Sequence, residues 1–218
     1  MRSVVSVVLS PRRYDRRVIP AIVLAAGKST RMGRPKAALP LGDGDTFLSR
    51  IVRTLHEARI DDVIVVVGHE SETIRASLAN SGVCARFVDN PDHESGQFSS
   101  LLKGLEAADR PDVSAALVTL VDVPLVTAAT VRAVVEQYLR TKAPIVRPTR
   151  GTEHGHPVLI DRSVFDDLRR ADRSSGAKPV VRAHASVAGD IPIEDDGAFL
   201  DIDTAADYQR VMRSMTQQ

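Results

Sequence analysis

The 218-residue chain has few of the features that mark special classes of protein. It has no tryptophan and one cysteine, Cys84. A single cysteine excludes a disulfide framework and a metal site built from cysteines, so Cys84 is predicted to be a packed thiol. The apolar run within residues 1–10 is too short to span a bilayer, and no small-residue cleavage site follows it. We therefore expect a cytoplasmic protein.

The sequence also lacks an excess of charge of either sign. Its 29 lysines and arginines nearly balance its 28 aspartates and glutamates. No overall field therefore favours nucleic acid or a membrane surface as a partner. With 43% hydrophobic residues, the chain has the ordinary composition of a soluble globular domain. We predict one domain over residues 19–218, preceded by an extension, residues 1–18, whose order the sequence leaves open.

Short apolar runs alternate with segments of helical periodicity along most of the chain. Residues 22–24 begin this pattern, and Thr46 and Thr127 each precede an apolar helical face, so both are predicted N-caps. Such an order stacks into a three-layer α/β sandwich, a Rossmann-like and mostly parallel sheet with helices on both faces. The other predicted strands are residues 62–67, 84–88, 115–121 and 144–147.

The pattern becomes irregular after residue 144. Several prolines interrupt short strand-like pieces there, and a helix over residues 205–214 is predicted at the end. We expect this part to decorate the sheet and to receive a second substrate. No linker is long enough to indicate a second domain.

The most informative segment is residues 21–36, AIVLAAGKSTRMGRPK. A buried strand leads into a loop whose alanines and glycines let backbone N–H groups approach a ligand closely. Arg31, Arg34 and Lys36 add charge that a polyphosphate would neutralise. The loop is not a P-loop, because Ile22 stands where that motif needs a glycine, five positions before Gly27. It is predicted to bind phosphates, with a basic surface turn as the alternative.

Two acidic segments are candidates for a metal site. Asp122 follows a buried strand, so it is predicted to face the loop across the carboxyl edge of the sheet, where its hard oxygens suit Mg²⁺. A turn aspartate is the alternative. A predicted short strand puts Asp201 and Asp203 on one face, and Asp203 is the better metal candidate. Thr204 and Asp207 also resemble a capping box, in which case Asp203 only introduces a helix.

Two further loops are candidate contacts for substrates. Residues 90–100 end a strand and open a helix, where a glycine and free N–H groups could meet a nucleobase or ribose. Residues 155–158 form a compact turn in which His156 either donates to an anionic or pterin-like acceptor or is structural. His69 and His93 have no partners at metal-ligand spacing, so they are interpreted as surface or loop residues.

Together these segments resemble the molybdenum cofactor nucleotidyltransferase family, whose fold is of the nucleotide-diphospho-sugar transferase type, over residues 19–214. Within it the chain is most similar to the molybdopterin cytidylyltransferases, because guanylyl relatives usually carry paired glycines at Ala26-Gly27. In the acceptor region, relatives often have Gly-Asp before Gly-Ala-Arg, whereas Ala171-Asp172 stands here before residues 174–178. The motifs that carry the resemblance are Leu24-Ala25-Ala26-Gly27, Arg31-Met32-Gly33, Pro35-Lys36, Asp122-Val123-Pro124, Gly155-His156-Pro157-Val158 and Asp201-Ile202-Asp203-Thr204.

The resemblance implies a role for each of these positions. Arg31 and Lys36 would bind the triphosphate and, with Asp122, carry catalysis. Asp122 and Asp203 would hold Mg²⁺. The remaining implied contacts are Leu24, Ala25, Ala26 and Gly27 with the base, Gly96, Ser99 and Ser100 in the nucleotide pocket, and Gly155, His156 and Pro157 with the pterin phosphate.

The expected activity is Mg²⁺-dependent transfer of CMP from CTP to the terminal phosphate of molybdopterin or molybdenum cofactor, with release of pyrophosphate. CTP and a phosphorylated pterin would be the partners, and a molybdoenzyme maturation protein is a further candidate partner. Two alternatives stay open: transfer to a sugar phosphate or another small phosphorylated metabolite, and nucleotide or cofactor binding without catalysis. A glycosyltransferase is disfavoured, because the Asp-x-Asp pair considered for metal binding, Asp201 and Asp203, lies near the C-terminus.

Overall fold

The computed structural model describes residues 18–27, 29, 32–42, 44–79 and 81–216. The predicted triphosphate ligand Arg31 lies outside these residues, as does the predicted extension apart from Val18. The described chain forms an eight-stranded sheet in the order β3-β2-β1-β4-β7-β5-β6, and β8 pairs with β5. The strands are β1 (Ala21–Leu24), β2 (Val63–Val67), β3 (Arg86–Asp89), β4 (Ala115–Leu120), β5 (Ile145–Arg150), β6 (Glu153–His154), β7 (Val158–Asp161) and β8 (Asp190–Pro192).

The centre of the sheet is parallel, as its apolar runs predict. β1 lies between β2 and β4, and Val23 is in register with Val65 on one side and Thr119 on the other. All residues of β1 and β2 are buried. Strands covered on both faces read as continuous apolar runs, which is why the sequence located them.

The prediction that the part after residue 144 only decorates the sheet is wrong. β7 pairs antiparallel with both β4 and β5, so it stands inside the sheet between them. The chain leaves β5, forms the two-residue strand β6 and returns as β7 through residues 155–157. A short return of this kind makes an antiparallel pair, whereas a parallel one needs a long crossover.

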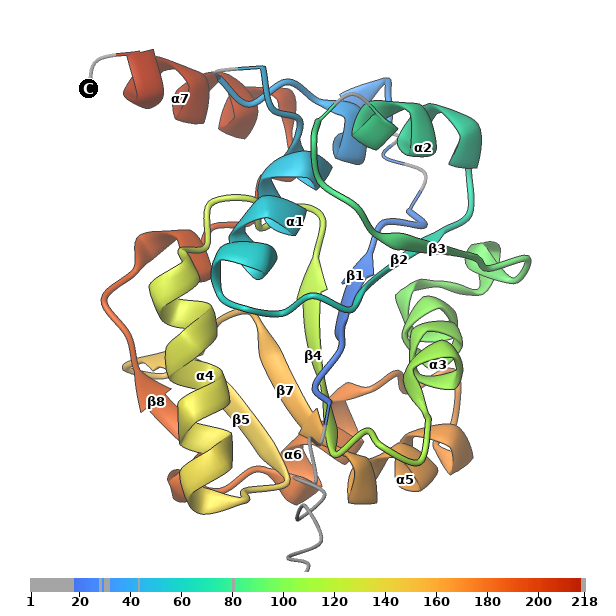
Figure 1. Ribbon diagram of the computed structural model, residues 1–218, viewed down its shortest axis with the longest axis vertical. Helices are drawn as coiled ribbons and strands as arrows, with labels where there is room; N and C mark the ends of the chain where they lie inside the picture. The colour runs from blue at the N-terminus through green and yellow to red at the C-terminus, as the bar shows by residue number, and fades with distance from the viewer. Residues whose placement is uncertain (1–17, 28, 30–31, 43, 80, 217–218) are drawn as a thin grey trace, which may run out of the picture.

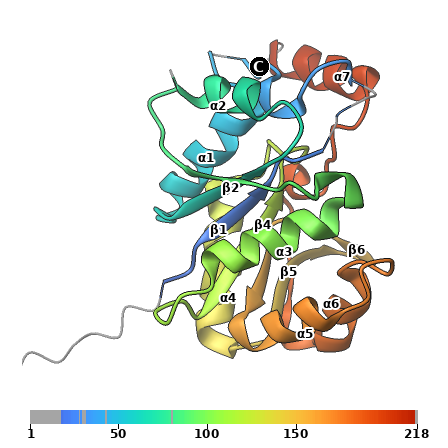
Figure 2. The same ribbon diagram turned by 90° about the vertical axis from the view of Figure 1, so that its right-hand side faces the viewer.

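Helices cover both faces of the sheet, which confirms the three-layer sandwich (Figures 1 and 2). Along β1 the side chains alternate: Ala21 and Val23 join the apolar core with α1, α2 and α4, while Ile22 and Leu24 join the core with α3 and α5. The helices are α1 (Phe47–Glu57), α2 (Ser71–Ala79), α3 (Gln97–Ala108), α4 (Ala128–Thr141), α5 (Phe165–Arg170), α6 (Lys178–His184) and α7 (Ala205–Thr216).

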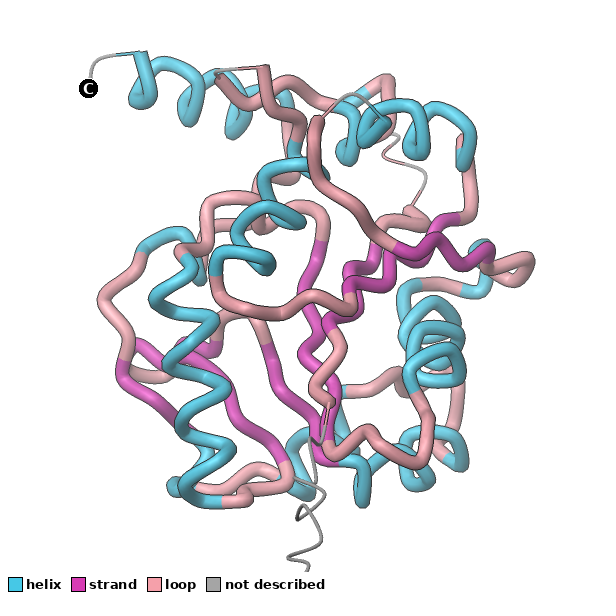
Figure 3. Tube along the Cα trace, in the orientation of Figure 1, coloured by secondary structure: helices cyan, strands magenta, loops and turns pink. Residues whose placement is uncertain are grey.

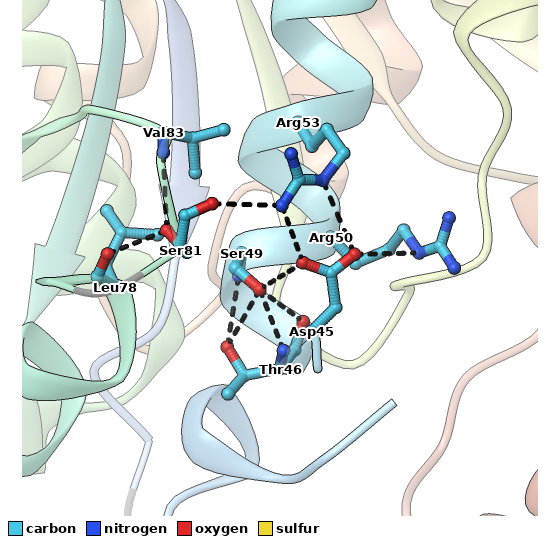
Figure 4. Close-up of polar contacts among 8 residues, drawn as sticks. All are labelled: Asp45, Thr46, Ser49, Arg50, Arg53, Leu78, Ser81 and Val83. Atoms are coloured by element: carbon cyan, nitrogen blue, oxygen red, sulfur yellow. Dashed lines mark hydrogen bonds and ion pairs between the residues drawn. The ribbon is translucent and has the colours of Figure 1, made fainter. Parts of the chain in front are cut away.

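The start of α1 is fixed by a polar network around Asp45 (Figure 4). Thr46 is the N-cap, as predicted, and forms a capping box with Ser49. The Asp45 carboxylate accepts hydrogen bonds from Ser49 Oγ and Arg53 Nη2, each at 2.9 Å. Burial opposes ionisation of Asp45, but these bonds and the charges of Arg53 and Arg50 outweigh it, so the pKa of Asp45 is lowered. The network anchors the loop before α1.

The last helix packs against the segment that follows the glycine loop. An apolar cluster joins Leu39, Leu41 and Phe47 to Ile202, just before α7, and to Val211 within α7. The hydroxyl of Tyr208 also donates to Pro40 O at 2.9 Å. Figure 3 shows these distant parts of the chain together at one end of the molecule. This packing brings the segment that follows the basic glycine loop close to the acidic segment 201–204 that precedes α7.

Two smaller observations complete the fold. Cys84 is exposed, so the prediction of a packed thiol is wrong. The reason is that β3 begins only at Arg86, which leaves Cys84 in the preceding loop. Within the described residues, no helix combines the length and apolarity needed to cross a membrane.

Candidate active site

A cavity of about 460 Å³ lies where β1 and β4 end. Carboxyl ends of parallel strands are the usual place for ligands in open α/β sheets. Eight of the predicted site residues lie along its wall: Leu24, Ala26, Gly27, Lys36, Gly96, Ser100, Asp122 and Asp203. Ala25 is not among the lining residues, because it is buried in the apolar core and its N–H donates to Val66 O at 2.9 Å.

The most distinctive contact in this cavity is a lysine held between two aspartates. Lys36 is only 8% exposed, and its Nζ donates to Asp203 Oδ1 at 2.6 Å and to Asp122 Oδ2 at 3.2 Å. Its backbone N–H donates to Ser29 Oγ at 3.1 Å, which ties it to the glycine loop. A buried ammonium requires such partners, since an uncompensated charge is costly away from water.

The two aspartates are brought together by a backbone contact. Ile202 N–H donates to Asp122 O at 2.8 Å, and Ile202 itself is fully buried. The predicted strand over residues 199–204 does not form, because this one hydrogen bond is not continued as a ladder. Thr204 and Asp207 form the predicted capping box: Thr204 N–H and Oγ1 donate to Asp207 Oδ2, and Asp207 N–H donates to Thr204 Oγ1. Asp203 therefore both introduces α7 and faces Lys36.

Negative charge is concentrated at this point of the cavity. Burial raises the pKa of Asp201, and the charges of Asp122 and Asp203 raise it further. His156 and Lys36 act in the opposite direction. Three carboxylates and one ammonium thus share a small region, which favours the binding of an additional cation.

The residues present fit a divalent cation that is shared with a phosphate ligand. Asp122 Oδ1 is buried and has no hydrogen-bond partner, so one hard oxygen is available at the cavity. Among the described residues, no group of three or more His, Cys, Asp or Glu could hold a metal by itself. Mg²⁺ commonly takes one or two carboxylates together with substrate phosphates, and Asp122 with Asp203 supply that donor set.

The segment before α3 forms another wall of the cavity. Gly96 has φ 95°, a conformation that favours glycine, and it is the N-cap of α3. Asn90 Nδ2 donates to Ser99 Oγ at 2.9 Å and to Ser100 Oγ at 3.0 Å. Ser100 lines the cavity, whereas Ser99 donates to Asp92 O and faces a different depression on the far side of the loop.

Three residues of this wall lie in the predicted segment but were not singled out as site residues: His93, Glu94 and Gln97 all line the cavity. His93 packs directly on Gly68, where a Cβ would lie 2.5 Å from His93 Cβ. The signal that could have located them is position, since they flank Gly96 in the loop between a parallel strand and its helix.

A second cavity, also of about 460 Å³, adjoins the first. Both are lined by Leu24, Gly96, Gln97 and Leu120, and His156 lines only the second. Burial of the imidazole lowers the pKa of His156, which favours its neutral form.

The other two residues of the predicted acceptor turn, Gly155 and Pro157, line neither cavity. Both are buried, and a Cβ at Gly155 would lie 2.4 Å from Ala198 O. The peptide bond between His156 and Pro157 is cis. Gly155 thus packs behind the wall that carries His156.

The fold is an α/β sandwich with two adjoining cavities, the first of them at the carboxyl edge of the sheet, where such folds usually bind ligands. Residues 21–187 match the family model described as the MobA-like NTP transferase domain. Because this match spans most of the chain, the protein belongs to that family and is a nucleotidyltransferase of the MobA-like type.

Individual relatives are similar over nearly their whole length. The purine catabolism protein PucB of Bacillus subtilis is 29% identical over 207 residues, which are 89% of this chain and 96% of that protein. A probable molybdenum cofactor guanylyltransferase of Mycobacterium avium is 26% identical, over 92% of this chain and 98% of that protein.

A solved structure is likewise similar over most of its length. Rv0371c of Mycobacterium tuberculosis is 30% identical and superposes with a TM-score of 0.75, covering 90% of this chain and 97% of that one. A second structure of Rv0371c is a complex with manganese, with 28% identity and a TM-score of 0.68 over 90% of this chain and 99% of that one.

Proposed function

We propose that this nucleotidyltransferase moves CMP from CTP to the terminal phosphate of a molybdopterin-type acceptor and releases pyrophosphate. The observation that carries the proposal is the buried Lys36 ammonium between Asp122 and Asp203, beside the glycine loop. This arrangement offers one cation and two carboxylates at the point where a triphosphate would meet a second substrate.

The chain's own residues supply binding and orientation. The backbone at Leu24, Ala26 and Gly27 approaches the ligand closely, and a Cβ at Gly27 would meet no atom within 4 Å, so the space beside it is open. The N-terminus of α3 adds the backbone N–H of its first residue, Gln97, which the helix leaves without an intrahelical partner. In this proposal these groups hold the base and ribose, and Arg31 and Lys36 hold the phosphates.

The reaction requires no nucleophile from the protein. An oxygen of the acceptor's terminal phosphate attacks the α-phosphorus in line, a new phosphoanhydride bond forms, and the bond from the α-phosphorus to the β-phosphate oxygen breaks. The departing pyrophosphate takes the electron pair of that bond. Lys36 stabilises the negative charge that spreads over the phosphates, so catalysis rests on position and charge.

A divalent cation fits this scheme. Asp122 and Asp203 would hold Mg²⁺, which when bound supplies positive charge to the triphosphate. The unpartnered Asp122 Oδ1 supports this assignment, and so does the manganese complex of the similar protein Rv0371c.

The proposal also specifies which nucleotide base and which acceptor the enzyme uses. Ala26 stands where guanylyl relatives usually have a glycine, which favours CTP. The M. avium relative is named for guanylyl transfer to molybdenum cofactor, which supports the acceptor and makes GTP the competing base. His156 in the wall of the adjoining cavity supports a second substrate on that side.

Pyrophosphate release tests the proposal. CTP, GTP, ATP and UTP are each incubated with the protein and Mg²⁺, with and without molybdopterin. We expect release only when CTP and the acceptor are both present, and equal release from Asp61→Asn, a control substitution at an exposed carboxylate before β2. Release confined to GTP would contradict the base assignment. If no nucleotide gives release with molybdopterin, the acceptor is wrong, and sugar phosphates become the next substrates.

A further inference from the structure

The second cavity has a chemical character that the nucleotide cavity lacks. Its floor comes mainly from β4, β7 and α3, with one residue each from β1 and α6, and most of its side chains belong to the apolar core on that face of the sheet. Such a floor removes apolar ligand surface from water and offers few polar partners. The apolar side chains of the floor are Leu24, Phe98, Leu101, Val118, Leu120, Val158, Ile160 and Val181.

A built loop forms the rim of this cavity. Asp172 accepts hydrogen bonds from Ser174 N–H at 2.9 Å, Ser174 Oγ at 2.6 Å and Ser175 Oγ at 3.3 Å. Gly176 follows with φ 68°, and Ala177 packs against the apolar core. These contacts give residues 172–178 a fixed course over the cavity.

The loop presents two cations that have no acidic partner. Arg173 and Lys178 both line the second cavity and are exposed, and neither forms an ion pair with the rest of the described chain. The preceding helix differs: Arg169 pairs with Asp109 and Asp166, and Arg170 pairs with Asp167. The basic side chains that face the cavity are thus the ones that a ligand can neutralise.

We propose that the second cavity holds the body of the acceptor and selects a planar, largely apolar ring system that carries an anionic group besides its reacting phosphate. Arg173 and Lys178 bind that second anion, and the floor packs against the ring. The inference rests on the proposed function in one respect, since that function places the reacting phosphate of the acceptor near Asp122. A neutral sugar would leave both cations unpaired and the floor poorly covered.

Binding of a matched pair of probes tests the ligand class. 1-Anilinonaphthalene-8-sulfonate is an apolar aromatic with an anionic group, and N-phenyl-1-naphthylamine is its uncharged counterpart. The full chain should bind the sulfonate once, and Arg173→Gln/Lys178→Gln should weaken that binding about tenfold or more, since charged hydrogen bonds are lost. Binding of the uncharged probe and of CTP should not change.

The matched control is Arg170→Gln/Arg182→Gln, which removes the same charge from exposed positions that do not line the cavity. It should leave both probes unaffected. Equal loss of the two probes in the cavity variant, or unchanged binding of the sulfonate, would overturn the inference. A loss of sulfonate binding in both double variants would also overturn it, because net charge alone would then explain the effect.

An activity measurement separates the inference from the proposed function. If molybdopterin is an acceptor, Arg173→Gln/Lys178→Gln should raise its KM about tenfold and leave the KM for CTP unchanged. An unchanged KM for the acceptor would overturn the inference while the proposed function stands. If wild-type protein releases no pyrophosphate with any nucleotide, the proposed function fails, and the two probes alone decide the ligand class of the cavity.

Discussion

The two adjoining cavities are alike in size but are built in different ways. The first cavity is made where β1 and β4 end, and its buried Lys36 is bonded to Asp122 and Asp203. The second cavity has an apolar floor and takes its charges from an exposed loop. The sheet thus fixes the positions of the charged groups in the first cavity, whereas the loop of residues 172–178 sets the positions of those in the second. If the second cavity holds the acceptor as we propose, a change of acceptor would require changes in this loop and none in the sheet.

The largest expected effect comes from Asp122→Asn, which removes a charge from the rigid cavity. We expect kcat to fall about 10²–10³-fold, the usual effect of losing one preorganised electrostatic contact. The melting temperature should change little, because Lys36 retains Asp203 as a partner. Steady-state pyrophosphate release and thermal unfolding check the two parts. Near-normal turnover at saturating Mg²⁺ would contradict the assignment of Asp122 as a metal ligand.

Lys36→Met should lower turnover by about 10²-fold, because an electrostatic contact with the phosphates is lost. It also leaves Asp122 and Asp203 facing each other without the ammonium that now joins them. We therefore expect the nucleotide-free variant to bind Mn²⁺ more tightly than wild type does, as measured by the electron paramagnetic resonance of free Mn²⁺. Equal Mn²⁺ affinity in the two proteins would show that the ammonium does not compete with a cation for the aspartates.

Gly155→Ala tests the packing behind the second cavity. The new Cβ would lie 2.4 Å from Ala198 O, so the chain has to shift, and we expect a loss of about 1–3 kcal/mol in the free energy of unfolding. Gly27→Ala is the matched control, because a Cβ there meets no atom within 4 Å. It should leave stability unchanged and raise the KM for CTP. Denaturant unfolding measures both effects. An equal loss of stability in the two variants would contradict the tighter packing at Gly155.

Asp45→Asn should have the smallest effect on catalysis, because the network of Figure 4 lies beside neither cavity. We expect a loss of about 1–2 kcal/mol in stability at neutral pH, discounted for the partial exposure of its arginine partners.

The pH dependence of this loss follows from the lowered pKa of Asp45. Its stabilisation is present above the pKa of the unfolded chain and is lost as the pH falls through the lower folded value. The difference between wild type and variant should therefore shrink in acid, as measured by urea unfolding from neutral to acid pH. A difference independent of pH would contradict this origin, and Asp61→Asn, at an exposed carboxylate, provides the control.

The sequence predicted the first cavity far better than the second, for a physical reason. Leu24, Gly27 and Asp122 lie within or just after buried parallel strands, where a local apolar run fixes both the strand and the place where it ends. Asp203 was predicted from a strand that does not form, yet one hydrogen bond from Ile202 still aligns it.

The second cavity depends on long-range packing that no local pattern encodes. The insertion of β7 between β4 and β5 creates its floor, and periodicity does not specify which strands become neighbours. The loop at residues 172–178 showed only a departure from the family pattern. Its role emerges once Arg173 and Lys178 are seen above that floor. The position of Ser99 outside the first cavity likewise depends on its hydrogen bonds with Asn90 Nδ2 and with the backbone carbonyl of Asp92.

The most direct test of the account is the fate of the α-phosphate. CTP radiolabelled at that position is incubated with wild-type protein, Mg²⁺ and molybdopterin, and the products are separated. We expect the label in a phosphoanhydride of the acceptor, in equal amount to the pyrophosphate released, and no such product with Asp122→Asn. Label that stays in CTP, or that appears only as free CMP while the acceptor is unchanged, would contradict nucleotidyl transfer to this acceptor.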